Sequence, residues 1–104
     1  MANRYYEKLA LILSDGELER IKISEGNGEL KLIADVHGMK CIQAKRFLSN
    51  IINVMRTAFQ LIIIHGFNHG TAIRDMLSKN FINPHIAYQY VDPYNEGMTH
   101  ILVS

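Results

Sequence analysis

The sequence Leu61-Ile62-Ile63-Ile64-His65-Gly66 joins a solid apolar run to a histidine and a glycine. An apolar run without alternation predicts a strand buried on both faces, and we expect it to span residues 59–64. Apolar and polar side chains alternate over residues 30–36, which predicts a second strand that ends at the motif Asp35-Val36-His37-Gly38. Between them, residues 40–58 carry apolar side chains at helical spacing. We therefore expect a βαβ unit, which brings both strand ends to one edge of a parallel sheet.

The rest of the chain adds elements around this unit. They are a helix over residues 3–14, a weak strand over 18–24, a hairpin turn at Asn27-Gly28, a helix over 70–79, and strands over 85–91 and 98–103. Together they predict the α/β class: a two-layer α/β sandwich with a βαβαββ core, a mixed four-stranded sheet and an N-terminal helix/strand extension. We expect residues 1–28 to form that extension, packed on a domain of residues 29–104.

Length and composition restrict the class of protein. A chain of 104 residues supports one domain, and an apolar content of 48% is enough for a core without disulfides or a structural metal. The single cysteine, Cys41, has no partner for an internal disulfide, which fits a reducing compartment. No apolar run approaches the roughly 18 residues of a membrane span, and the N-terminus lacks a signal-peptide pattern. We expect a cytoplasmic protein that does not bind membranes.

The net charge of +1 hides an uneven distribution. Residues 31–84, which contain both motifs, have seven basic and two acidic side chains, whereas the flanking segments are acidic overall. A local positive field favours a phosphate-bearing ligand. The alternative is that these charges only solvate a helix face.

The second motif has the composition of an anion site. Gly66 and Gly70 flank a short loop between a buried strand and a helix, where free backbone N–H groups and the helix dipole attract phosphate. Arg74, one turn into that helix, adds a cation. The alternative is that a short loop simply needs its glycines.

The first motif has the composition of an acid–base pair. Asp35 and His37 are two residues apart, so on an extended strand their side chains share one face. A carboxylate beside a histidine holds one imidazole tautomer and raises its basicity. The two also suit a divalent cation, for which His65 would be the third ligand. The alternative is that Asp35 caps the next helix or bonds loop amides.

Elsewhere, Tyr88 and Tyr90 share a strand face and either stack on bases or pack on the sheet.

These motifs resemble the Smr (small MutS-related) domain family over residues 30–104. Ala34-Asp35-Val36-His37-Gly38 resembles the family's first motif, Leu-Asp-Leu-His-Gly. The family's second motif, His-Gly-x-Gly-x-Gly, is matched at His65, Gly66 and Gly70, and its following Leu-Arg at Ile73-Arg74. Residues 97–103 resemble the family's closing glycine and Thr-x-Val-x-Leu. The chain departs from the family in the glycine loop, at Phe67, Asn68 and His69.

The resemblance implies a nucleic-acid-binding domain that nicks DNA or cleaves structured RNA. It implies a catalytic set of Asp35, His37 and His65, in which Asp35 positions a water, a metal ion or His37, and His65 acts as general acid or base or binds the scissile phosphate. The residues expected to bind phosphate are Gly66, Phe67, Asn68, His69, Gly70, Arg74 and Lys40. The chain has no room for the ATPase part of a MutS protein, so we expect a stand-alone Smr protein.

Two other functions compete with the endonuclease. The first is a non-catalytic module that binds nucleic acid or the ribosome, and the second is a binder of small phosphates or a plain interaction domain. We expect no cofactor for folding and leave a divalent cation, Mg²⁺ or Mn²⁺, open for cleavage. A monomer or weak homodimer is expected, in which the apolar N-terminal segment covers a sheet edge of its own chain or docks on a second copy.

Overall fold

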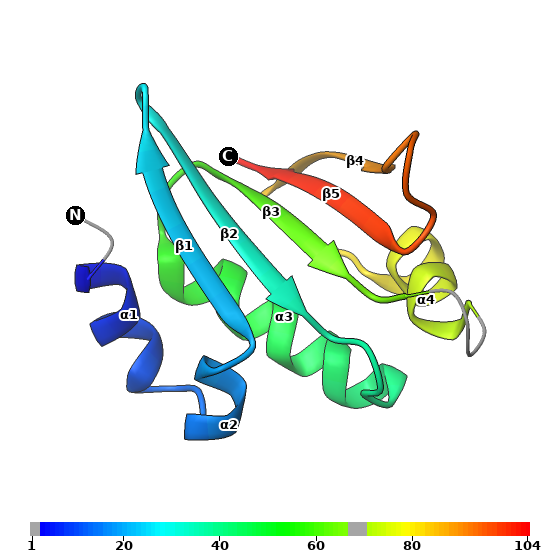
Figure 1. Cartoon of the computed structure of the whole chain (residues 1–104), viewed down its shortest axis with the longest axis horizontal. Helices are drawn as coiled ribbons and strands as arrows, with labels where there is room; N and C mark the ends of the chain where they lie inside the picture. Colours follow the sequence, from blue (N-terminus) through cyan, green and yellow to red (C-terminus); the bar gives the residue numbers. More distant parts are fainter. Residues whose placement is uncertain (1–2, 67–70) are drawn as a thin grey trace.

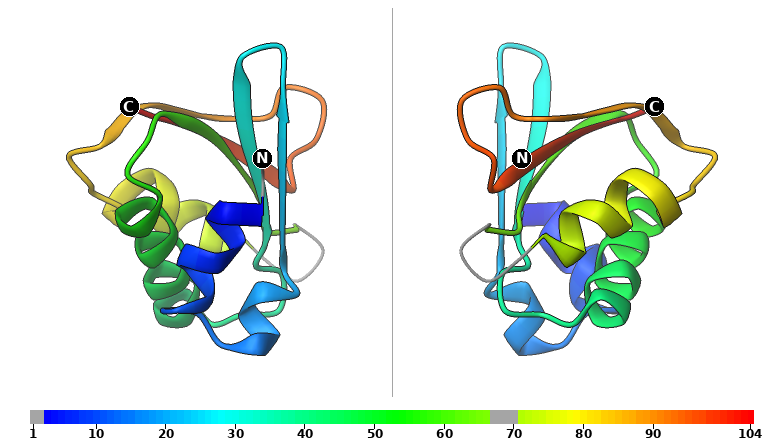
Figure 2. Two further views of the ribbon diagram at one scale, coloured as in Figure 1. Left: turned by 90° about the vertical axis from the view of Figure 1, so that its left-hand side faces the viewer. Right: turned by 90° about the vertical axis from the view of Figure 1, so that its right-hand side faces the viewer.

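A five-stranded mixed sheet with the order β1-β2-β3-β5-β4 organises the computed structural model of this chain (Figure 1). The structure describes residues 3–66 and 71–104. The helices α1, α3 and α4 lie together on one side of the sheet, and no helix from the described ranges covers its other face (Figure 2). This arrangement confirms the predicted two-layer α/β class. The sheet has one strand more than predicted, because the strand of the N-terminal extension joins it.

The predicted βαβ unit is present. Strand β2 (Glu29–Asp35) and strand β3 (Phe59–Ile64) pair in parallel, and helix α3 (Cys41–Met55) connects them. The register places Asp35 opposite Ile64, the last residue of β3. The two strands therefore end side by side, and the segments that follow them start from one edge of the sheet.

Helix α3 is held by one apolar stripe. Its buried residues are Ala44, Phe47, Leu48, Ile51, Ile52 and Met55. The predicted helix over 40–58 is too long at its C-terminal end, because Arg56 adopts left-handed backbone angles (φ 51°, ψ 40°) and ends the helix. Ala58, the last residue of the predicted helix, is exposed beyond that point.

The prediction that the central strand is buried on both faces is wrong. Phe59, Leu61 and Ile63 are buried under the helices, whereas the alternate side chains of β3 are only partly covered. Those alternate positions, Gln60, Ile62 and Ile64, lie on the face that no described helix covers. Their partial burial comes from side chains on the neighbouring strands, since a second layer of helices is absent from the described ranges.

The N-terminal extension folds onto the sheet. It contains helix α1 (Asn3–Ala10), helix α2 (Asp15–Leu18) and strand β1 (Ile21–Gly26), which pairs antiparallel with β2 through the predicted turn at Asn27-Gly28. Both turn residues have positive φ, 53° and 76°, as a tight two-residue hairpin requires. The strand predicted from residue 18 begins later, at Ile21, because Ser14 and Glu17 form a capping box that starts α2.

The N-terminal segment also protects a sheet edge, as one of its two predicted roles required. The backbone N–H of Ile23 on the edge strand β1 donates to the hydroxyl of Tyr6 on α1, at 2.9 Å. Tyr5, Leu9 and Leu13 bury the apolar side of this segment. The extension is thus part of the same core as the rest of the chain.

The C-terminal part completes the sheet. Helix α4 (Ala72–Asn80) starts two residues later than predicted, and β4 (Ile86–Val91) and β5 (Met98–Val103) form an antiparallel hairpin. Strand β5 inserts between β3 and β4 and pairs antiparallel with both. Within the described residues, no helix is long and apolar enough to cross a membrane.

Candidate active site

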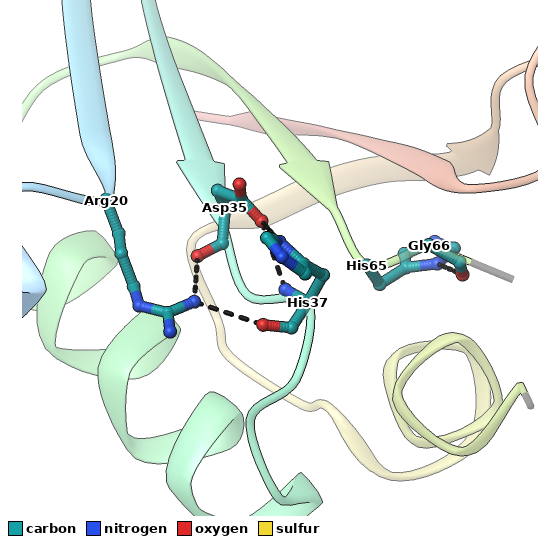
Figure 3. A network of polar contacts seen from close by, with 5 residues as sticks. All are labelled: Arg20, Asp35, His37, His65 and Gly66. Carbon is teal, nitrogen blue, oxygen red and sulfur yellow. Dashed lines mark hydrogen bonds and ion pairs between the residues drawn. The ribbon is translucent and has the colours of Figure 1, made fainter. Parts of the chain in front are cut away.

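Asp35 and His37 form a hydrogen-bonded pair at the end of β2 (Figure 3). Asp35 Oδ1 accepts a hydrogen bond from His37 Nδ1 at 2.5 Å and a second from the backbone N–H of His37 at 3.1 Å. The carboxylate accepts, so Nδ1 carries the proton and Nε2 is the ring nitrogen that this bond leaves unused. The His37 side chain is 67% exposed and that of Asp35 36%. Asp35 therefore bonds a loop amide and also orients the imidazole, and its part in acid–base chemistry stays a prediction.

Arg20 holds the backbone of this pair in place. Its guanidinium nitrogen NH1 donates to the carbonyl oxygens of Asp35 and His37, each at 3.1 Å (Figure 3). In return, the backbone N–H of Asp35 donates to the carbonyl of Arg20 at 2.8 Å. Arg20 lies in the extension and outside both motifs. The motifs give no signal for Arg20, although the register set by the Asn27-Gly28 turn places it opposite Asp35.

His65 is buried, and both of its ring nitrogens bond within the protein. Nδ1–H donates to the carbonyl of Gly66 at 2.9 Å, which leaves Nε2 of the neutral ring to accept from the hydroxyl of Thr99 at 2.8 Å. His65 is 7% exposed and Thr99 only 1%. The geometry gives His65 a positioning role for the start of the glycine loop. Its assignment as a general acid or base stays a prediction.

The second motif begins with a close approach of two backbones. The N–H groups of His65 and Gly66 both donate to the carbonyl of Gly97, at 2.9 and 3.0 Å. A Cβ on Gly97 would lie 3.1 Å from the Cα of Gly66, so a side chain fits here only if the backbone shifts. Gly66 has a positive φ of 73°, which favours glycine. The β4–β5 connection thus fixes the position of Gly66.

The two motifs meet, as the βαβ topology predicted. A Cβ on Gly66 would lie 3.8 Å from the Cβ of His37, and Figure 3 shows His65 and Gly66 beside the Asp35–His37 pair. Of the predicted loop residues, Phe67, Asn68, His69 and Gly70 lie outside the described residues. The exposed imidazole of His37 is therefore adjacent to the first glycine of the expected phosphate loop.

The two predicted cations lie on the helices that follow the motifs. Lys40 is the exposed N-cap residue of α3, and its side chain makes no capping bond. Arg74 lies in the first turn of α4, and its Nε is 3.9 Å from Oδ1 of Asp75. The hydroxyl of Thr71, the N-cap of α4, donates to Asp75 as well, at 2.9 Å. Asp75 thus offsets part of the positive charge that Arg74 brings to this helix start.

A metal site is not assembled by the residues that the structure describes. Nowhere in residues 3–66 and 71–104 do three His, Cys, Asp or Glu side chains gather as a metal-binding group. The predicted third ligand, His65, uses its ring nitrogens on Gly66 and Thr99. Asp35 and His37 would contribute two ligands at most.

The site combines an exposed Asp–His pair, an arginine that fixes its backbone, and a glycine held by the β4–β5 connection. Such an arrangement can accept a proton at His37 Nε2 next to a backbone that admits a close ligand. A comparison of the chain with protein-family models, curated proteins and solved structures finds no match. The resemblance to Smr domains therefore rests on the quoted motifs alone.

Proposed function

We propose that this protein binds nucleic acid and cleaves phosphodiester bonds, as an endonuclease of the Smr type. The observation that carries the proposal is the hydrogen-bonded Asp35–His37 pair, exposed at the strand end beside Gly66. An oriented, accessible imidazole is the usual general base of hydrolytic enzymes. The motif resemblance and the basic excess of residues 31–84 support a phosphate-bearing substrate.

In this proposal His37 is the catalytic residue and Asp35 positions it. Nε2 of His37 takes a proton from the attacking water, whose oxygen forms a bond to phosphorus. The bond from phosphorus to the leaving oxygen breaks, and that oxygen takes a proton from solvent. Asp35 stabilises the imidazolium that forms, and Gly66 allows the phosphate to approach the backbone. Lys40 and Arg74 offset the phosphate charge.

The test is cleavage of supercoiled plasmid and of structured RNA, with magnesium, with manganese and with a chelator. We expect His37→Ala to lower the cleavage rate by about 10²- to 10⁴-fold, the usual contribution of a general base. Asp35→Asn keeps the shape of the side chain but removes its charge, so it lowers kcat more than it changes KM. His85→Ala, which removes an exposed histidine from the turn before β4, is the matched control.

Two outcomes contradict the nuclease. One is that the wild-type protein leaves both substrates uncut under all three metal conditions. The other is that His37→Ala cleaves at the wild-type rate. The chelator arm decides whether a divalent cation takes part.

A second candidate is a non-catalytic module for nucleic acid, free or within the ribosome. The observation that favours it is the engagement of both ring nitrogens of His65, which leaves His37 as the one accessible histidine of the predicted catalytic set. It predicts binding that weakens as salt rises, survives Asp35→Ala and occurs without cleavage. Binding that ignores salt would contradict it.

We also propose a cytoplasmic location and a monomer or weak homodimer. The free thiol of Cys41 supports a reducing compartment. The bond from Ile23 to Tyr6, which covers one sheet edge, supports the monomer.

A further inference from the structure

The uncovered face of the sheet carries one continuous row of side chains across all five strands. Strand pairing aligns Tyr90 on β4 with His100 on β5, then Ile62 on β3, Ile33 on β2 and Lys22 on β1. Residues paired directly across neighbouring strands point to the same face. The row therefore runs from an aromatic residue at one edge of the sheet to a lysine at the other. Its width is about 19 Å, from four strand spacings of about 4.8 Å.

The aromatic end of the row is rigid. The rings of Tyr90 and His100 stack with centroids 4.8 Å apart and planes 9° apart. The His100 ring is itself held on both nitrogens, since Nε2–H donates to Asp92 Oδ2 at 2.7 Å and Nδ1 accepts from Gln60 Nε2 at 2.9 Å. Tyr88, next to Tyr90 with centroids 5.6 Å apart, is 59% exposed. Two tyrosines are thus offered to solvent on a support fixed by hydrogen bonds.

The other end of the face carries two lysines and leads to the candidate active site. Lys22 is exposed. Lys31 lies on the same face, two residues before Ile33 on β2, and its side chain is 44% exposed and 3.7 Å from Glu29. The next row towards the carboxyl edge pairs Met98, Ile64 and Asp35. The uncovered face and the Asp35–His37 pair are therefore continuous.

From this juxtaposition we propose that the uncovered face binds single-stranded nucleic acid, with bases stacked on Tyr88 and Tyr90 and the backbone running past Lys31 and then Lys22 towards Asp35. This inference rests on the proposed function and specifies its substrate class. Every unpaired base has a π-face that can stack on an aromatic ring, whereas the bases of a duplex are already stacked on each other. The lysines complement the charge of phosphate. A row that begins with an exposed tyrosine and ends in an exposed lysine favours a polyanion with unpaired bases over the apolar face of a second copy.

The test is fluorescence anisotropy with a labelled oligouridine, its deoxythymidine counterpart and a duplex of equal length. The His37→Ala protein is used so that the probes stay intact. We expect the single strands to bind at least about tenfold more tightly than the duplex. In that background, Tyr88→Ala weakens single-strand binding about 5- to 150-fold, as loss of one stacked base predicts, and Tyr88→Phe keeps most of it.

Matched variants separate the contribution of the uncovered face from general effects of mutation. Tyr94→Ala removes a tyrosine that is 98% exposed on the β4–β5 connection, and we expect it to bind as the parent does. Lys22→Gln reduces the slope of log affinity against log salt by about 0.7, the value of one phosphate contact on a single strand. Circular dichroism and thermal melting confirm that each variant is folded. Because Tyr88 is largely exposed, its replacement leaves the core intact.

Three results overturn the proposal: equal binding of duplex and single strand, unchanged binding by Tyr88→Ala, or a dimer that Tyr88→Ala dissociates. The last result would assign the face to a second copy. Failure of the proposed function is distinguishable. If the protein binds single strands through Tyr88 but the wild type does not cleave, only the nuclease proposal is contradicted. If Tyr88→Ala cleaves as the wild type does, only the proposed binding by the uncovered face is contradicted.

Discussion

The Asp35 carboxylate binds both the backbone N–H and the imidazole of His37 through one oxygen atom, Oδ1. The first bond fixes where the chain turns after β2, and the second fixes the orientation of the ring. The same residue is thus structural and functional, and a single change at Asp35 disturbs both roles. For this reason the proposed catalysis is best tested at His37, whose side chain is mostly exposed.

Arg20 makes the geometry of the pair depend on a residue outside the motifs. Arg20→Ala removes two charge-assisted bonds to the carbonyls of Asp35 and His37. We expect it to lower the free energy of unfolding by about 1–3 kcal/mol and, if the protein is a nuclease, to lower kcat as well. Urea unfolding measures the first effect. Lys45→Ala, an exposed change on α3, is the control. An Arg20→Ala protein as stable as that control contradicts the role of Arg20 in holding this backbone.

Asp92 links stability to pH. The hydrogen bond from His100, followed by the one from the backbone N–H of Tyr94, lowers the pKa of Asp92 from its ordinary value of 3.8. A carboxyl group with a lowered folded-state pKa stabilises the fold fully above its unfolded pKa and loses that contribution as the pH falls through the folded pKa. We expect the free energy of unfolding of Asp92→Asn to fall less steeply than that of the wild type as the pH drops below about 4. Urea unfolding at several pH values across this range tests the prediction. A variant whose free energy of unfolding depends on pH as that of the wild type does contradicts it.

At the scale of elements, the sequence predicts the elements whose signals are local. The apolar run before His65 and the Asn27-Gly28 turn locate β3 and the β1–β2 hairpin, because turn chemistry and hydrophobic pattern act within a few residues. The same patterns misjudge the faces of β3. A run such as Leu61-Ile62-Ile63-Ile64 does not distinguish a strand that is covered on both faces from one that has an uncovered face. In this sheet the uncovered face of β3 is shared with Tyr90 and Leu102.

The sequence pattern also fails to predict the end of α3, because the residue with left-handed backbone angles is Arg56 and not a glycine. A non-glycine residue in that conformation carries strain. We expect Arg56→Gly to raise the free energy of unfolding by about 0.5–1 kcal/mol. Thermal and urea unfolding measure the change. Lys45→Gly, an exposed position inside α3, is the control and lowers stability by about 1 kcal/mol. A destabilised Arg56→Gly protein would contradict the assignment of strain.

At the scale of the molecule, the meeting of the two motifs was predictable and the bonding within it was not. Parallel pairing of β2 and β3 follows from the βαβ order and places Asp35 and His65 at one edge. The engagement of His65 by Thr99 depends on β5, which inserts between β3 and β4. Which strand occupies that place is a property of the whole sheet, so local patterns carry no signal for it.

The protection of the β1 edge belongs to the same scale. Tyr6→Phe removes the acceptor for the N–H of Ile23 and leaves an unpaired donor on an edge strand. We expect a loss of stability of about 1 kcal/mol and concentration-dependent self-association, because an open edge pairs with other chains. Urea unfolding and light scattering after gel filtration measure both effects. Tyr94→Phe is the matched control, and a Tyr6→Phe protein that stays as monomeric as this control contradicts the edge role.

The contact between Gly97 and Gly66 has a consequence for genetics. Gly97 has no side chain to offer a substrate, yet any larger residue there must move Gly66 and, with it, the segment that follows β3. Random mutagenesis with selection for lost function would therefore return substitutions at Gly97 together with those at Asp35 and His37. Such a map would mark as functional a residue that contributes only a backbone carbonyl and the absence of a side chain.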